Sequence, residues 1–547
     1  MNKQKLINNF LDRGFLVSPD FLREFNLDQE IFLRLLNRKL KNKDKPFVLN
    51  KDLLNIFQEA DFIPEINWLE FEKSRAFSEK GKKEKVYKTF LNILNYNISK
   101  KKKNDIDRIV KDVKKPEGKI ILDKSEKEYS NIIVLKNYKE KDKKREINDF
   151  VGYFRSRYDK LREILQKRRE LQDVVSIKRV LDKREKGDVS LIGLLANKHV
   201  TKAGNIILNL EDSTGRISVI IKKEDRELTQ IAKNLVFDEV IGVRGLYNNK
   251  FVFCNSLYFP GFPEKELKKA EDDVYVVFTA DLHFGNKNFL LKDFMKFIDW
   301  LNCKTGDKKQ RIISSKVRYL FIVGDVVDGV GIFPGQEEEL LIKDIYKQYE
   351  GCARLLSKIR KDINIVICAG NHDALRLSEP QPVLDKNLAK PLWDLPNVTI
   401  VTNPSVVNLH SSKDFDGFNL LLYHGYSFQY YADNVENIRI AGGTTRADLV
   451  MKLLLEKRHL APSHTSTLYI PDSISDPLVI EKIPDFFVTA HIHRTTVSNY
   501  KGVSLIGCGC WIPQTPFQEK VGLHPEPSKV PLVNLKTREI KVMDFGK

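Results

Sequence analysis

The chain has little cysteine and no long apolar segment. Its six cysteines are scattered through 547 residues, a spacing that excludes a disulfide framework or a zinc ribbon. Apolar runs such as Phe418 to Tyr423 are far shorter than the roughly 18 residues of a membrane span, so we expect no membrane partner. The cysteines are Cys254, Cys303, Cys352, Cys368, Cys508 and Cys510.

A secretory signal is also missing from the first residues. The segment MNKQKLINNFLDRG has no continuous apolar core and no small-residue cleavage site. With so few cysteines, this indicates a reduced, intracellular protein.

Positive charge is in excess. Lysine and arginine number 92 against 74 aspartates and glutamates, a formal net charge of +18. A hydrophobic fraction of 42% is enough to form cores, which excludes a wholly disordered chain. A basic intracellular protein favours an anionic partner, and nucleic acid is the commonest one.

The sequence before residue 272 predicts three regions, of which the first two are a helical domain and a linker. Residues 1–70 predict a small helical domain, with helix starts at Ser18-Pro19 and Asn50. Residues 71–148 predict a basic, flexible linker, because 101–148 holds 16 basic and 10 acidic residues. This linker is interpreted either as a solvated spacer or as an arm that attracts phosphate.

Residues 149–263 predict a helix followed by a β-barrel. Phe150, Phe154, Tyr158, Leu161 and Leu165 keep the 3–4 spacing of an amphipathic helix. The pattern then changes to period 2, in the order of three strands, a helix and two strands, which is the order of an OB-fold barrel. The strands are expected over 189–194, 205–210, 217–221, 240–246 and 251–253, and the helix over 224–235. Few aromatic residues lie on these strands, so subunit docking is as good an interpretation as binding of a single strand.

Residues 272–547 alternate buried strands with helices, and five strands end in residues of metal-ligand type. Ligands of open α/β sheets bind beyond the carboxyl ends of the strands, so these residues are expected to meet in one crevice. Each short motif alone is weak, but five in sequence, each after an apolar strand, are specific. The clusters are Asp281-Leu282-His283, Gly324-Asp325, Gly370-Asn371-His372-Asp373, His424-Gly425 and His491-Ile492-His493.

This set of residues predicts two divalent cations. Carboxylates supply negative charge and can bridge two ions, and imidazoles favour manganese, iron, zinc, nickel or cobalt over magnesium or calcium. Two ions clamp a phosphate and generate hydroxide near neutral pH. His372, beside the ligand Asn371, is expected to face the phosphate or the leaving oxygen, with Asp373 holding its tautomer.

These motifs resemble those of the calcineurin-like metallophosphoesterases. The resemblance implies a two-sheet α/β sandwich flanked by helices, so the whole chain is expected to be a multidomain α+β protein. It also implies that His372 assists the departing oxygen. One metal would be held by Asp281, His283, Asp325 and His493, and Asp325 would bridge to a second held by Asn371, His424 and His491.

The domain order is similar to that of the small, exonuclease subunits of archaeal family D DNA polymerases. The stretches 149–154, 210–215 and 457–462 add to this similarity. The resemblance implies a 3′→5′ proofreading exonuclease, with manganese as the expected metal and iron, zinc, nickel or magnesium as alternatives. It also implies a large polymerising subunit and DNA as partners, in the archaeal cytoplasm at the nucleoid.

Two departures from the superfamily pattern bear on substrate class. Ala490 stands where glycine usually precedes His-x-His, and we expect the site to tolerate its methyl group. Gly329 follows Asp328 where the protein phosphatases carry arginine, which argues against a phosphoprotein phosphatase.

Three alternatives remain. The chain could be a non-catalytic assembly scaffold, or a stand-alone DNA-repair nuclease, although the latter class carries its catalytic domain at the N-terminus. Gln4, Ile7, Phe10 and Leu11 could form a sliding-clamp peptide, but the same residues form the apolar face of the first helix, and we favour that interpretation.

Overall fold

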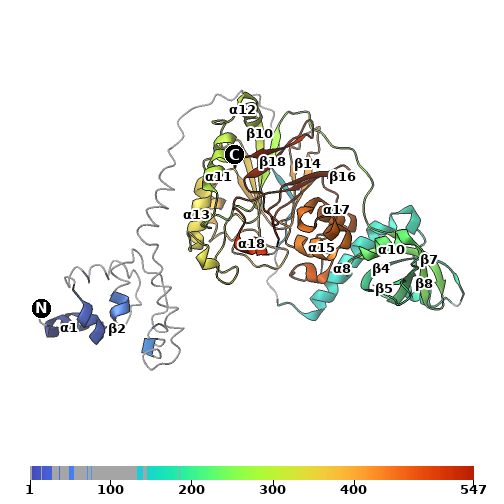
Figure 1. Cartoon of the computed structure of the whole chain (residues 1–547), viewed down its shortest axis with the longest axis horizontal. Helices are drawn as coiled ribbons and strands as arrows, with labels where there is room; N and C mark the ends of the chain where they lie inside the picture. Colours follow the sequence, from blue (N-terminus) through green and yellow to red (C-terminus); the bar gives the residue numbers. More distant parts are fainter. Residues whose placement is uncertain are drawn as a thin grey trace. The chain divides into compact units, whose positions relative to one another are not determined.

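The computed structural model divides into two units, Met1–Lys119 and Ile120–Lys547, each described by itself (Figure 1). The described residues are 3–13, 15–26, 32, 36, 48–54, 71, 75–76, 132–139, 144–183, 185–472, 474–520 and 522–547.

The N-terminal unit has a small core built from phenylalanine and leucine. Phe10 and Phe21 are fully buried, with their rings edge to face at 5.6 Å. Ser18 caps a helix as predicted, its Oγ accepting from the Phe21 amide at 3.4 Å, and Asn50 Oδ1 accepts from Leu53 N at 2.9 Å. Because Phe10 lies in this core, the helix-face interpretation is favoured over a clamp peptide. The elements are α1 (Lys3–Leu11), β1 (Leu16–Val17), α2 (Pro19–Glu24) and β2 (Val48–Leu49), with β1 and β2 parallel.

The second unit contains a closed five-stranded barrel, with strand order β4-β5-β6-β8-β7. β4 is longer than predicted, because its first half pairs with β7 and its second half with β5. The register shifts between Leu195 and Asn197, and such an irregularity lets one strand bend between two neighbours and close a barrel. The elements are β4 (Gly187–Val200), β5 (Ile206–Asp212), β6 (Gly215–Ile221), α10 (Arg226–Lys233), β7 (Val240–Asn248) and β8 (Phe251–Tyr258).

The helix before the barrel, α8 (Ile147–Gln166), has a different buried face from the predicted one. Phe150 is 41% exposed, whereas Tyr153, which the 3–4 pattern omitted, is fully buried. Tyr158, Leu161 and Leu165 are buried as predicted. The two halves of α8 bury different faces. The second half packs along the barrel, and the first half packs against the C-terminal domain.

Two six-stranded sheets form the C-terminal domain, with the orders β12-β11-β10-β9-β18-β19 and β16-β17-β15-β14-β13-β3. Side chains from both sheets, among them Phe278, Phe321, Leu420 and Phe486, share one buried core, so the sheets form a sandwich. Helices flank it, with α11 and α13 on one side and α15 and α17 on the other (Figure 1). The first sheet contains β9 (Tyr275–Thr279), β10 (Val317–Val323), β11 (Asn364–Cys368), β12 (Val398–Val401), β18 (Lys529–Asn534) and β19 (Ile540–Asp544). The second contains β13 (Ser405–Leu409), β14 (Phe418–Leu422), β15 (Phe486–Thr489), β16 (Thr496–Tyr500) and β17 (Val503–Gly507), and the main helices are α11 (Leu291–Leu301), α12 (Lys308–Ser315), α13 (Ile345–Leu356), α15 (Phe428–Asn434) and α17 (Ala447–Lys457).

One edge strand lies within the segment that was predicted to be a flexible linker. β3 (Ile133–Lys136) lies within 71–148 but pairs antiparallel with β13. The run Ile132 to Leu135 supplies the apolar residues of a strand. The prediction missed this strand because it was based on the basic composition of the whole segment. Most of the remaining linker lies outside the described residues.

Buried ion pairs fix the barrel and α8 to the C-terminal domain. Glu239, before β7, pairs with Lys457 of α17 at 2.5 Å, and neither side chain is more than 3% exposed. Arg157 of α8 is also buried, donating to Asp476 Oδ2 at 2.7 Å and to the Pro462 carbonyl at 2.6 Å. Breaking such a pair by removing one partner typically costs about 3–5 kcal/mol, so these contacts hold the two domains in one orientation.

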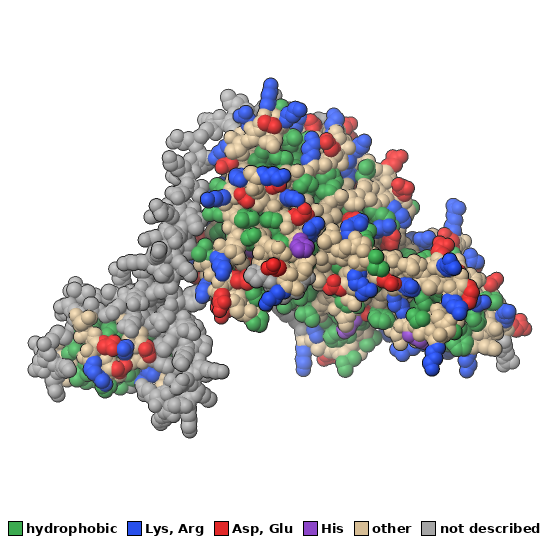
Figure 2. Space-filling view, in the orientation of Figure 1, with side chains coloured by type: hydrophobic (Ala, Val, Ile, Leu, Met, Phe, Trp, Pro, Cys, Tyr) green, Lys and Arg blue, Asp and Glu red, His purple; other side chains and the backbone are tan. Residues whose placement is uncertain are grey.

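Charges of both signs cover the visible face of the molecule (Figure 2). On this face the positive excess is spread among acidic side chains. Across the described residues, no helix is both long and apolar enough to cross a membrane.

A buried histidine at the α8 junction predicts acid sensitivity. His459 Nε2 donates to Asp476 at 2.7 Å while Nδ1 accepts from the Ala461 amide at 3.0 Å, so the neutral ring is fully bonded. Burial, and then the charge of Arg157, lower the pKa of His459 to about 4. The unfolded chain therefore binds the extra proton first. We expect the His459 contribution, on the order of 3 kcal/mol, to be present above pH 6.5 and lost as the pH falls toward 4.

Urea unfolding midpoints at pH 7.5 and 4.5 check this expectation. His459→Gln should lose less stability over this interval than the wild type, because glutamine does not titrate. His199→Gln, at an exposed position of β4, should keep the wild-type dependence. An equal loss in His459→Gln and the wild type would contradict the assignment.

Candidate metal centre

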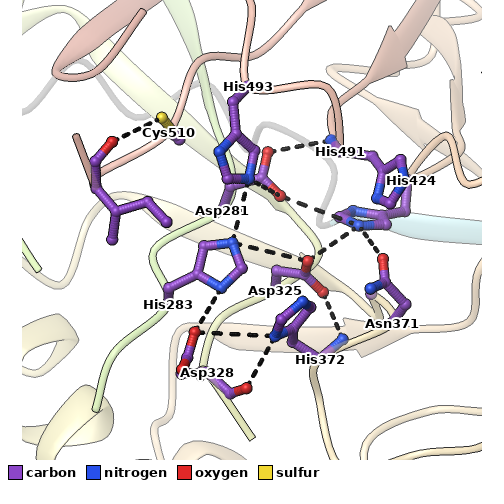
Figure 3. Close-up of polar contacts among 12 residues, drawn as sticks. Asp281, His283, Asp325, Asp328, Asn371, His372, His424, His491, His493 and Cys510 are labelled. Carbon is purple, nitrogen blue, oxygen red and sulfur yellow. Dashed lines mark hydrogen bonds and ion pairs between the residues drawn. The ribbon is translucent and has the colours of Figure 1, made fainter. Parts of the chain in front are cut away.

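The predicted ligands come from the ends of five strands in both sheets. β9 leads to Asp281 and His283, β10 to Asp325, β11 to Asn371 and His372, β14 to His424, and β15 to His491 and His493. β9, β10 and β11 run parallel in one sheet, and β14 and β15 run parallel in the other. The structure brings all eight predicted residues into one centre (Figure 3).

The backbone at these strand ends is unusual. Asp281, His283, Asp325, His491 and His493 all have positive φ, between 48° and 69°. Such conformations cost a non-glycine residue of order 1–3 kcal/mol and persist only where neighbouring structure fixes them. Here the amides of Asp281 and His283 donate to the carbonyls of Gly324 and Asp325, at 3.1 and 3.0 Å. The strand ends therefore hold one another in place.

Two glycines allow these strand ends to approach. A Cβ on Gly324 would lie 2.3 Å from Nδ1 of His424, and one on Gly370 would lie 2.3 Å from Asp325 Oδ1. Any side chain at either position would displace a ligand.

The polar side chains form three overlapping groups, each with ligand atoms within 4.8 Å of one another. Asp325 belongs to two of them and lies 3.3 Å from His424 Nε2, which in turn lies 2.9 Å from Asn371 Oδ1. In the third group, His283 Nε2 and His493 Nε2 are 3.2 Å apart. Asp325 therefore lies within reach of ligand atoms in two of the three groups. The groups are Asp281, His283 and His493; His283, Asp325 and His372; and Asp325, His424 and His491.

One carboxylate oxygen in this centre is orphaned. Asp281 Oδ2 accepts from the His491 amide at 3.1 Å, but the fully buried Oδ1 finds no hydrogen-bond partner among the described residues. Burial raises the pKa of Asp281 to about 7. A buried acceptor facing imidazole nitrogens without a donor is what a cation requires, so these residues fit a divalent metal ion.

Outer contacts orient the imidazoles. His424 Nδ1 donates to the Val323 carbonyl at 2.9 Å, which turns Nε2 toward Asp325 Oδ2 at 3.3 Å. His283 Nδ1 lies 2.9 Å from Asp328 Oδ1, a carboxylate–histidine pair of the kind that supports metal ligands. The sequence analysis missed this role of Asp328. Its signal is the second carboxylate of the stretch Gly-Asp-Val-Val-Asp-Gly.

The residue that orients His372 differs from the prediction. Asp373 does not contact the ring, because its oxygens accept from the amides of Val326, Val327 and Gly370. The prediction is wrong because neighbouring residues in this tight turn point in different directions. His372 Nδ1 instead donates to the Asp328 carbonyl at 2.9 Å, and burial lowers the pKa of His372. The neutral ring therefore keeps Nε2 as a proton acceptor.

Comparison with known proteins agrees with this geometry. A family model described as calcineurin-like phosphoesterase matches residues 274–495. The DNA polymerase II small subunit of Methanothermobacter thermautotrophicus is 41% identical over 402 residues, which are 73% of this chain and 80% of that protein. The chain belongs to this family of archaeal small subunits. The member from Pyrococcus horikoshii is 39% identical over 409 residues, and the match spans 73% of this chain but only 63% of that protein.

The family places the chain as a small subunit of an archaeal DNA polymerase with a C-terminal metallophosphoesterase domain, and it implies divalent metal ions. A solved archaeal phosphodiesterase is similar at 11% identity. The match covers 49% of this chain and 99% of that chain, with a TM-score of 0.25.

Ala490 stands directly before the two histidines of the last strand end. Its methyl group is fully buried in the core between the sheets, and its amide donates to the His424 carbonyl at 2.8 Å. The extra carbon therefore points away from the ligands.

Removing the outer carboxylate should weaken metal binding. Asp328→Ala leaves His283 without the group that fixes its ring, and we expect the affinity for Mn²⁺ to fall about 10- to 100-fold. Titration calorimetry with Mn²⁺ measures this loss. Asp394→Ala, which removes an exposed carboxylate elsewhere in the domain, should leave the affinity unchanged. Equal affinities in the wild type and Asp328→Ala would contradict the role given to Asp328.

Proposed function

We propose that this chain is the 3′→5′ proofreading exonuclease subunit of a two-subunit archaeal replicative DNA polymerase. The observation that carries the proposal is the complete ligand set with the orphaned Asp281 oxygen, in a chain of the polymerase small-subunit family. A subunit that served only as a scaffold would have no need of this buried polar cluster and its strained backbone.

Two divalent cations, with manganese expected first, fit the ligand set. Asp281, His283, Asp325 and His493 would hold one ion, and Asp325, Asn371, His424 and His491 the other. When bound, such ions supply positive charge to the phosphodiester and lower the pKa of water to near neutrality. Iron, zinc, nickel and magnesium are alternatives.

His372 is assigned to proton transfer at the leaving oxygen. Its Nδ1 proton is held by the Asp328 carbonyl, so only Nε2 exchanges protons with a bound molecule. The His372 amide also donates to Asp325 Oδ1 at 2.8 Å, which ties the position of the ring to the ligands. Nε2 of the neutral ring would first take up a proton from water and then give it to the 3′ oxygen of the shortened primer, which leaves as a hydroxyl group.

The barrel is assigned as an OB fold that joins this subunit to a large polymerising subunit. Its closure of β6 against β8 in parallel, with a helix between the third and fourth strands, supports the OB assignment. The buried Glu239–Lys457 pair supports a rigid platform, because it holds the barrel in a fixed orientation to the nuclease domain. DNA is the substrate, and the archaeal cytoplasm at the nucleoid is the expected location.

Hydrolysis of a 5′-labelled primer tests the nuclease. With Mn²⁺, the wild-type chain should give a ladder of 3′-shortened products, with and without the large subunit. Asp325→Ala should reduce cleavage to background, and His372→Ala should slow it by about 10²- to 10⁴-fold. His199→Ala, on the exposed surface of the barrel, is the matched control and should cleave like the wild type.

Two other outcomes separate the alternatives. If no variant cleaves and the chain still restores synthesis by the large subunit, the scaffold function stands and the nuclease proposal fails. Full activity that never depends on, and never binds, the large subunit would instead favour a stand-alone repair nuclease.

A further inference from the structure

A short loop presents apolar side chains beside the candidate centre. The loop 329–335 follows Asp328 directly, and its Val330 and Phe333 are 44% and 38% exposed. The Phe333 ring lies 6.3 Å from the ring of His372, at an angle of 65° between the two planes. The structure therefore holds a partly exposed aromatic ring beside the proposed proton donor.

Two fully buried glutamines fix this loop. Gln348 holds its first residue from both sides, accepting from Gly329 N at 2.9 Å and donating to Gly329 O at 3.0 Å. Gln336 donates to the Asp328 carbonyl at 2.8 Å and accepts from Ile332 N at 2.9 Å. The Phe333 carbonyl accepts from the Gln336 amide at 3.3 Å. The exposed ring is therefore carried by a fixed loop.

The loop also lies close to the backbone of His372. A Cβ on Gly329, where φ is +75°, would lie 2.3 Å from the His372 carbonyl oxygen. An arginine at this position, as in the protein phosphatases, would require this contact to open. The chain instead offers a neutral, apolar surface at Val330 and Phe333.

We propose that Phe333 is a specificity-determining residue that stacks on the base of the 3′-terminal nucleotide. This inference rests on the proposed function, in which His372 meets the phosphate of that nucleotide. The group that neighbours a phosphate within one nucleotide and offers a flat apolar face is the base. Stacking on an aromatic ring accepts every base, because each has a π face, and proofreading must remove all four.

The platform also favours an unpaired end. A terminal base must leave the duplex stack before it can lie on Phe333, and this step costs least for a mismatched base. Stacking of the base on a ring that is already fixed in place offsets part of the free energy lost when the base leaves the duplex.

Primers with and without a terminal base test the inference. Two 5′-labelled single-stranded primers of one sequence end in thymidine or in an abasic tetrahydrofuran residue, and kcat/KM for removal of the last residue is measured with Mn²⁺. Phe333→Ala should lose roughly tenfold on the thymidine primer and nothing on the abasic primer. Phe333→Trp should restore the preference for the base. Phe237→Ala, with a ring of similar exposure in the loop before β7, is the matched control and should leave both rates unchanged.

Each other result is decisive. An equal loss on both primers means that Phe333 only supports the loop, and no loss on either means that the base lies elsewhere; both overturn the inference while the wild-type cleavage preserves the proposed function. Absence of cleavage by the wild type overturns the proposed function, and with it the inference.

Discussion

The burial of two carboxylates in one centre is the constraint on which the C-terminal domain depends. Asp281 and Asp325 are at most 1% exposed, and a buried negative charge is unfavourable unless positive charge or donors surround it. Burial alone would raise the pKa of Asp325, but His424 and His283 hold it well below the usual value. The sandwich satisfies this requirement by bringing strand ends from both sheets together, which places imidazoles on every side of the two aspartates.

Asp328 connects this centre to its surroundings. Its carboxylate meets His283 on one oxygen and Asn286 and Gln336 on the other, while its carbonyl accepts from His372 and Gln336. One residue thus orients a ligand, fixes the tautomer of the proposed proton donor and anchors the loop that carries Phe333. The same residue therefore links the ligand geometry to the proposed proton transfer and to the proposed recognition of the terminal base.

Buried contacts join the barrel and α8 to the domain that carries this centre. Buried ion pairs at Glu239 and Arg157 fix the barrel and α8 to the C-terminal domain. A rigid connection suits the proposed function, in which the subunit receives a primer end from a partner. The N-terminal unit has a core of its own, built from residues such as Phe10 and Phe21.

The candidate ligand set could be predicted from sequence, because each of its residues follows an apolar strand and strand ends meet by topology. Its members are Asp281, His283, Asp325, Asn371, His372, His424, His491 and His493. The sequence also determined the element order of the barrel, since period-2 patterns and turn residues are local. The partner of His372, the contacts of Asp328 and the pairing of β3 with β13 could not be predicted from sequence. Those features depend on side-chain directions and contacts between segments far apart in the chain. Neither spacing nor composition encodes such contacts, because they arise only when both sheets have packed.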